Sequence, residues 1–218
     1  TGDWSGRIVS LLPVTWVQDW PIPGEVLPQN IGTMKWDGKI PFKHTEKLSI
    51  KRSDDFDEDC LAPQWQWNYQ PRKDYFSLTE RPGWLRLKAY RPLETNNLLK
   101  AGNTLTQRTF RKQNNDVTIK MDISNMQDGQ KNGLCHFSSQ HSAIGIVKEE
   151  DACYLEYRKN GNITKGIQIH SEFVWFRTEW GMDGKSQYYY SLDGDNFLPF
   201  GEKYQLTWGN YRGDRIGI

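Results

Sequence analysis

The sequence predicts an all-β protein, an antiparallel β-sandwich of the jelly-roll type. Apolar and polar residues alternate in short runs that recur about every ten residues. No stretch keeps helical spacing for three turns. Asn-Gly and Asp-Gly pairs separate several of these runs, notably at residues 159–162 and 192–195. Such pairs supply the positive φ angles of tight hairpins, so neighbouring strands are expected to be antiparallel.

The aromatic stretch Gln64–Ala89 predicts a hairpin on which the sheet is built. Residues 75–78 and 84–87 read as strands, and the polar turn Thr79–Gly83 joins them. The later runs are expected to form strands laid beside these two. They cover residues 104–110, 116–123, 133–138, 143–147, 154–159, 163–170, 172–178 and 186–192.

The first 50 residues have a different pattern. Residues 8–12 and 14–17 predict two short strands, followed by a turn rich in Pro and Trp. Two short strands cannot bury both faces, so they need a partner sheet. From residue 25 the apolar periodicity fades among Pro and Gly residues, which indicates a linker that ends at residue 50.

The charge balance argues against two classes of partner. The chain has 28 basic and 27 acidic residues and a formal net charge of +1, so neither nucleic acid nor an anionic membrane would be held by bulk electrostatics. Its apolar runs are far shorter than the roughly 18 residues of a membrane span. A neutral ligand fits better. Cys60, Cys135 and Cys153 lack the CxxC spacing of a zinc site.

No catalytic residue is expected within the chain. Glycanases built on a β-sandwich carry paired carboxylates on one strand, spelled Glu-x-Asp-x-x-Glu, and the run Glu149–Asp151 lacks the later Glu because Tyr154 stands there. The four histidines lie on separate segments without HExxH spacing. The pattern therefore predicts binding or packing.

Aromatic residues beside polar planar groups are the candidates for binding. Trp65 and Trp67 lie in the first predicted strand of the sandwich, and Trp208 and Tyr211 lie near the end of the chain. Flat rings pack against the apolar face of a sugar while polar neighbours bond its hydroxyls. The alternative is core packing, because alternate side chains of a sandwich strand must point inward.

An acidic run precedes the aromatic hairpin. Asp54, Asp55 and Asp57 could supply oxygen ligands to a structural calcium ion. The alternative is a solvated turn, because the run lacks the glycine and the spacing of a helix-loop-helix calcium loop. No cofactor is expected to be required.

Five segments resemble one family. Four of them resemble the concanavalin A-like β-sandwich at the C-terminus of glycoside hydrolase family 43 β-xylosidases and α-L-arabinofuranosidases, also classed as carbohydrate-binding module family 91. The fifth is similar to the end of the five-bladed catalytic propeller of those enzymes. The four are LAPQWQWNYQP, FSLTERPGWLRLKA, NTLTQRTF and YYYSLDGDNFLPFG, and the fifth is GRIVSLLPVTWVQDWPIPG.

The resemblance implies how the chain is divided into domains and where the catalytic residues lie. Residues 1–24 would be a remnant of the propeller, 25–50 a linker and 51–218 an accessory sandwich. The catalytic carboxylates would lie upstream in the propeller, in the same or a separate chain, and would act by inversion. Relatives continue beyond Ile218 through a strand that closes the sheet, so an exposed edge is expected here.

The resemblance also implies a function. The sandwich would pack on the propeller and help to shape or bind xylan, arabinoxylan or xylo-oligosaccharides. A loop that leans over the propeller pocket would contribute Tyr211, or Trp208 if the register differs. A secreted or periplasmic protein is expected rather than a cytoplasmic one. The alternatives are a free-standing lectin-like module and a purely structural sandwich, and the strand expected at residues 8–12 favours the enzyme part.

Overall fold

The computed structural model describes residues 3–7, 10–39, 51–209 and 211–218. The chain divides into two compact units, Thr1–Arg7 with Lys51–Ile218, and Ile8–Ile50. The predicted start of the sandwich at residue 51 coincides with this division. The predicted division differs in one place, because residues 3–7 belong to the sandwich unit.

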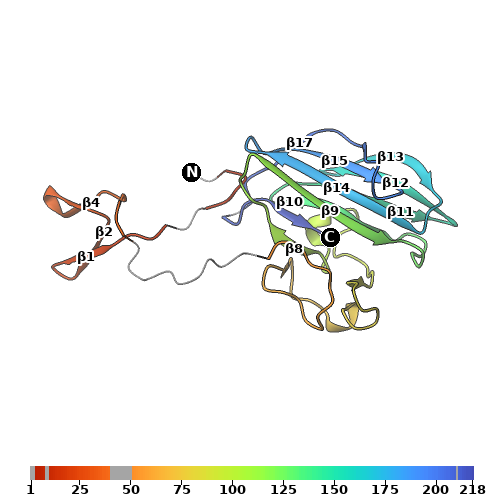
Figure 1. Ribbon diagram of the computed structural model, residues 1–218, viewed down its shortest axis with the longest axis horizontal. Coiled ribbons are helices and arrows are strands. Elements are labelled where there is room, and N and C mark those ends of the chain that lie inside the picture. Colours follow the sequence, from red (N-terminus) through yellow and green to blue (C-terminus); the bar gives the residue numbers. More distant parts are fainter. Residues whose placement is uncertain (1–2, 8–9, 40–50, 210) are drawn as a thin grey trace. The chain divides into compact units, whose positions relative to one another are not determined.

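The sandwich consists of two antiparallel sheets, as the alternation predicted (Figure 1). The larger sheet has seven strands, in the order β13-β12-β11-β10-β18-β8-β5. Their bounds are β13 Asn162–Ile169, β12 Ala152–Lys159, β11 His141–Glu149, β10 Lys131–Phe137, β18 Arg215–Gly217, β8 Leu105–Arg108 and β5 Gln66–Trp67.

The smaller sheet has the order β16-β15-β14-β9, and β17 also pairs with β15. Figure 1 shows β9, β14 and β15 side by side. The bounds are β16 Leu198–Pro199, β15 Lys185–Ser191, β14 Phe173–Gly181, β9 Asn114–Asp122 and β17 Tyr204–Gln205.

Alternate residues of each sheet fill the core. Ile144 and Ile146 of β11 and Val174 and Phe176 of β14 are buried in one hydrophobic cluster. Their sequence neighbours point to the opposite faces, as the two-residue period of a strand requires. The core therefore lies between the sheets, and each sheet has an outer face of its own.

Two expectations about the sheet are wrong. The aromatic hairpin is formed, but β6 (Phe76–Ser77) and β7 (Arg86–Leu87) make a separate two-stranded sheet instead of the foundation of the sandwich. The expected exposed edge is also absent from this position, because β18 pairs with β10 on one side and β8 on the other. Strand β18 thus lies inside the sheet and joins β10 to β8.

The segment 3–7 completes the sandwich. Trp4 belongs to the core cluster and is 6% exposed, and its carbonyl accepts a hydrogen bond from the Asp214 amide at 2.7 Å. Gly6 and Gly213 cross backbone to backbone, both at φ +78°, and a Cβ on Gly213 would lie 2.6 Å from the Gly6 nitrogen. Glycine is therefore required at this crossing.

The second unit contains two small hairpins. Strand β1 (Val14–Val17) pairs with β2 (Trp20–Pro23), and β3 (Val26–Leu27) pairs with β4 (Ile31–Gly32) around the 3-10 turn η1 (Pro28–Asn30). The region predicted as an irregular linker thus begins with a hairpin.

The strand predicted at residues 8–12 is not formed in its described part, residues 10–12, which have no partner strand. Residues 8 and 9 lie outside the described ranges.

The other helical elements are also single turns. They are the 3-10 turns η2 (Lys73–Tyr75) and η3 (Leu98–Lys100). In the described part of the chain, no helix has the length and apolar character to cross a membrane.

Candidate functional site

Trp208 and Tyr211 lie together in the turn between β17 and β18. Their ring centroids are 5.8 Å apart and the rings are nearly perpendicular. Tyr211 is 61% exposed and has a φ of +75°, a left-handed conformation that a bulky residue adopts only where its surroundings impose it. The structure therefore brings both predicted residues together as one aromatic pair. We call the segment that carries the pair the Tyr211 turn (residues 207–209 and 211–214).

Contacts from two sides hold this turn. The Arg7 guanidinium carbon lies 4.1 Å from the centroid of the Tyr211 ring, and the Arg7 amide donates to the Tyr211 carbonyl at 3.2 Å. The Ser139 hydroxyl donates to the Trp208 carbonyl at 2.6 Å. A ring that is fixed at its backbone and exposed at its edge is suited to contact a ligand without first losing conformational entropy.

A buried His-Asp pair lies beneath the turn. His136 Nδ1 is 2.8 Å from Asp214 Oδ1, its Nε2 is 2.9 Å from the Thr178 hydroxyl, and the His136 and Asp214 side chains are fully buried. Burial raises the pKa of the Asp214 carboxyl, and the neighbouring His136 opposes this shift. Because neither side chain reaches solvent, the pair anchors the turn and cannot meet a substrate.

Sequence reasoning missed this pair. His136 and Asp214 are separated by 78 positions, so no local motif joins them. The one available signal was the alternation of β10, which puts His136 on the same inward face as Leu134. The adjacent Tyr188 extends the network, because its hydroxyl accepts from the His136 amide at 2.9 Å and donates to the Ser142 carbonyl at 2.9 Å.

Trp65 and Trp67 are half-buried and occupied by contacts within the sandwich unit. Trp65 stacks on Phe56 at a centroid distance of 5.6 Å and donates its indole N–H to Asp54 at 2.7 Å. Trp67 lies 4.8 Å from the ring of Phe76. Within the described ranges, no aromatic contact joins either ring to the Tyr211 turn. These contacts favour a packing role for both rings.

The acidic run does not converge on one point. Asp54 Oδ1 accepts from the Phe56 amide at 3.1 Å, Oδ2 accepts from Trp65, and its side chain is 8% exposed. Asp55 and Asp57 are exposed. Among the residues that the structure describes, no three His, Cys, Asp or Glu side chains are grouped so as to hold a metal ion. Asp54 therefore acts as an acceptor that fixes the loop before β5.

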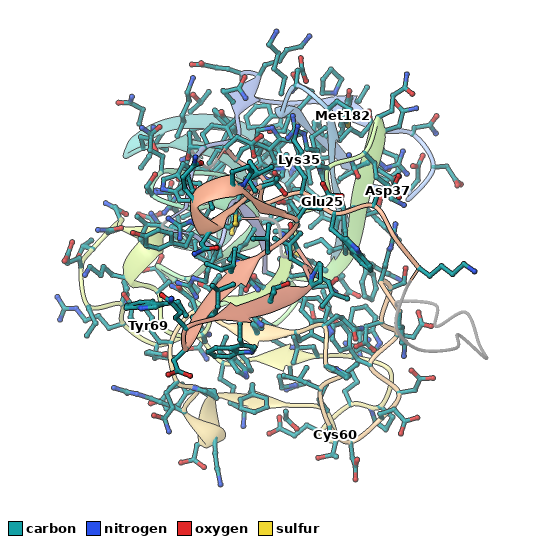
Figure 2. All side chains as sticks on the ribbon, turned by 90° about the vertical axis from the view of Figure 1, so that its left-hand side faces the viewer. Glu25, Lys35, Asp37, Cys60, Tyr69 and Met182 are labelled. Carbon is teal, nitrogen blue, oxygen red and sulfur yellow. The ribbon has the colours of Figure 1, made fainter. Side chains whose placement is uncertain are left out.

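Other conspicuous side chains have simple places. Trp180 is 5% exposed and donates its indole N–H to the Phe110 carbonyl at 3.0 Å. Figure 2 shows Tyr69 and Cys60 at the surface, where Tyr69 is 40% exposed and donates its hydroxyl to the Leu99 carbonyl at 3.0 Å.

A cavity of about 1420 Å³ lies in the sandwich unit. Its lining includes Trp65, Trp84, Lys120, Gly133, Gly145 and Arg158.

The fold agrees with a comparison to known families. Residues 53–218 match the model of the beta-xylosidase C-terminal concanavalin A-like domain. The chain belongs to this family. The all-β, concanavalin A-like sandwich expected from the four sequence segments is thereby confirmed. In this C-terminal concanavalin A-like domain, the segment 3–7 that supplies Trp4 precedes the matched residues by more than 40 positions.

Two curated relatives of the domain cover nearly the whole chain. A beta-xylosidase of Formosa agariphila is 34% identical over 234 residues, which is 98% of this chain and 39% of the relative. A putative beta-xylosidase of Xylanibacter ruminicola is 31% identical over 215 residues, 97% of this chain and 39% of the relative. The chain thus spans well under half the length of these relatives.

A solved structure shares the fold. A bifunctional GH43-CE protein of Bacteroides eggerthii superposes with a TM-score of 0.76 at 29% identity, over 99% of this chain and 28% of its own. The likeness extends through the hairpin residues as well as the sandwich, since almost the entire chain is aligned.

Proposed function

We propose that the chain is the C-terminal accessory part of a family 43 glycosidase that acts on xylan, arabinoxylan side chains or xylo-oligosaccharides. In this proposal the sandwich packs on a catalytic propeller, in the same or a separate chain, and presents Tyr211 to the substrate. The observation that carries it is the Tyr211 turn, in which the exposed ring of Tyr211 is held against the half-buried ring of Trp208. The domain's relatives are called beta-xylosidases.

In this proposal the catalytic carboxylates lie in a propeller outside this chain. The chain covers only 39% of the Formosa agariphila relative, which leaves room for such a domain. The chain by itself is therefore expected to cleave no glycoside. Residues 10–24, which include β1 and β2, are proposed to belong to that propeller. A secreted or periplasmic location fits an enzyme whose substrate is a polymer.

The test is hydrolysis of an aryl xyloside and an aryl arabinofuranoside by this chain alone and by the chain joined to its catalytic propeller. The joined protein is expected to be active and the isolated chain inactive. Tyr211→Ala in the joined protein should raise KM about tenfold, the loss expected for one ring in contact with a sugar. Tyr211→Phe should behave as the parent, because the proposal requires the ring and not the hydroxyl.

Tyr69→Ala is the matched control, since Tyr69 is also an exposed tyrosine but lies outside the Tyr211 turn. An unchanged KM in Tyr211→Ala would show that the Tyr211 ring does not contact the substrate. Turnover by the isolated chain would overturn the assignment of catalysis to the propeller.

We further propose that no cofactor is required, with calcium at Asp54, Asp55 and Asp57 as the alternative. Both carboxylate oxygens of Asp54 already accept protein hydrogen bonds, which supports the first of these. Thermal unfolding in EDTA and in millimolar calcium should then give midpoints within about 1 °C. A rise of several degrees with calcium would establish the alternative, because a ligand that binds the native state stabilises it.

A further inference from the structure

The outer face of the smaller sheet carries three aromatic side chains that the proposed function does not use. Val174 and Phe176 of β14 point into the core and are fully buried. Phe173 and Trp175 alternate with them, are half-buried and therefore lie on the outer face. Together with Trp84 they form what we call the aromatic strip (Trp84, Phe173 and Trp175).

Trp84 reaches the strip from a loop far away in sequence. Its ring centroid lies 6.1 Å from that of Phe173, with the planes inclined by 38°. The loop is fixed by an ion pair between Arg81 and Asp122 at the end of β9, and the Arg81 guanidinium carbon lies 4.2 Å from the Trp84 ring. The loop thus extends the aromatic surface of the sheet beyond its edge strand.

A single ammonium group is shared by the three rings. Lys120 of β9 stands opposite Trp175 in the register, and its Nζ lies 4.5 Å from the centroid of Phe173, 5.0 Å from Trp175 and 5.6 Å from Trp84. Lys120 is exposed and takes part in no ion pair among the described residues. Its three N–H donors are therefore free to bond a ligand that lies on the rings.

Polar groups continue the strip along the sheet. The Arg177 Nε donates to the Thr118 hydroxyl at 2.9 Å. This pair lies two residues along each strand from the Trp175 and Lys120 pair, on the same face of the sheet. The Arg177 guanidinium carbon also lies 3.7 Å from the ring of Phe197. Hydrogen-bond donors from β9 and β14 thus lie beside the aromatic rings on this face.

Packing accounts for part of this arrangement. Trp84 fixes its loop against the sheet, and the turn at Gly194 closes on Trp175, since a Cβ on Gly194 would lie 3.1 Å from that ring. Cation–π attraction explains why the Lys120 ammonium lies among the rings. The rings nevertheless remain half-exposed on this face. A group of partly exposed rings with donors beside it has the composition of a surface that binds sugars.

We propose that the aromatic strip binds a pyranose chain of a neutral polysaccharide of the xylan class, at a place separate from the Tyr211 turn. The rings stack on the apolar faces of successive sugars, and Lys120 and Arg177 donate to their hydroxyls. The Arg81 charge is neutralised by Asp122, and the net charge of +1 gives the chain no bulk attraction for an acidic polymer. The choice of xylan rests on the proposed function, but the site does not.

The test is affinity electrophoresis of the 218-residue chain in gels that contain soluble arabinoxylan, acidic glucuronoxylan or no polysaccharide. Arabinoxylan should retard the parent. Trp175→Ala should weaken the retardation roughly tenfold, as expected for the loss of one stacked ring, and Lys120→Ala should weaken it less. The control is Tyr154→Ala, which removes a comparable pair on the larger sheet, where the Lys165 Nζ lies 3.6 Å from the Tyr154 ring.

Unfolding midpoints of all variants show that each is folded, and Lys120→Ala keeps the test decisive if Trp175→Ala does not fold. The proposal is overturned if the parent runs unretarded in arabinoxylan, or if Trp175→Ala and Lys120→Ala are both retarded as strongly as the parent. Stronger retardation by glucuronoxylan than by arabinoxylan would contradict the proposal that the ligand is neutral.

Failure here is distinguishable from failure of the proposed function. Tyr211→Ala should leave retardation unchanged, and Trp175→Ala should leave KM for an aryl xyloside unchanged in the protein joined to its propeller.

Discussion

The sandwich and the hairpin unit are both built from antiparallel strands, but only the sandwich has an interior. Its two sheets enclose fully buried side chains such as Leu134, Ile144 and Phe176. In the described residues 10–39, Gly24 alone is buried, while Trp16 and Trp20 are 68% and 74% exposed. Hydrogen-bonded strands are thus insufficient for a stable unit, which requires a second layer to cover the first.

The comparison gives physical support to the proposed propeller. An apolar hairpin with exposed tryptophans is expected to bind a neighbouring protein surface, since soluble proteins rarely leave such patches uncovered. The sandwich, by contrast, needs no partner to bury its core. The two units are therefore expected to respond differently to mutation.

The largest effect should come from Trp4, the tryptophan nearest the start of the chain. Trp4→Ala leaves a cavity in the sandwich core and should lower the free energy of unfolding by about 3–5 kcal/mol, as measured by urea denaturation. A chain that begins at residue 51 should lose at least as much, because it lacks the whole segment 3–7. Parent-like stability in both proteins would mean that this segment is dispensable.

Asp214→Ala should have the next largest effect, about 1–3 kcal/mol, because it leaves His136 without its buried acceptor. The pH dependence has a defined sign. The folded pKa of Asp214 lies above its ordinary value of 3.8, so its protonated form stabilises the fold below that value, and this contribution is lost as pH rises through the folded pKa. Urea denaturation from pH 4 upward should therefore show the difference between parent and variant shrinking. A difference that grows with pH would contradict the burial argument.

Asp54→Ala should cost about 1–2 kcal/mol, because the Phe56 amide and the Trp65 indole N–H both lose their acceptor. Trp65 fluorescence should also shift to longer wavelength as its ring loosens. Asp55→Ala is the control, since Asp55 is exposed. Equal effects of the two changes would show that the acidic run acts as a whole.

The smallest effect is expected in the hairpin unit. Trp20→Ala should change the free energy of unfolding of this chain by no more than about 0.5 kcal/mol, because the ring is exposed. In the protein joined to its propeller, the same change should cost several times as much if the ring is then covered. Identical small effects in both proteins would show that this hairpin does not pack against the propeller.

Alternation predicted the long strands well, most clearly β9 and β14, in which burial follows the two-residue period. It failed where pairing is short or distant. The two-residue strands β5, β6 and β7 carry no period, and nothing in residues 3–7 indicates that Trp4 enters a core formed by residues far along the chain. Trp208 and Tyr211 were found through a resemblance, whereas His136, Asp214 and the aromatic strip depend on register and remained hidden.

Strand β18 has a consequence for the order in which the protein folds. It lies between β10 and β8, so these two earlier strands must remain unjoined until residues 215–217 have been synthesised. Pairings over such long sequence separations form slowly, and until then both strands expose backbone groups that another chain could bond. The nascent sandwich should therefore be most prone to aggregate before residues 215–217 have left the ribosome.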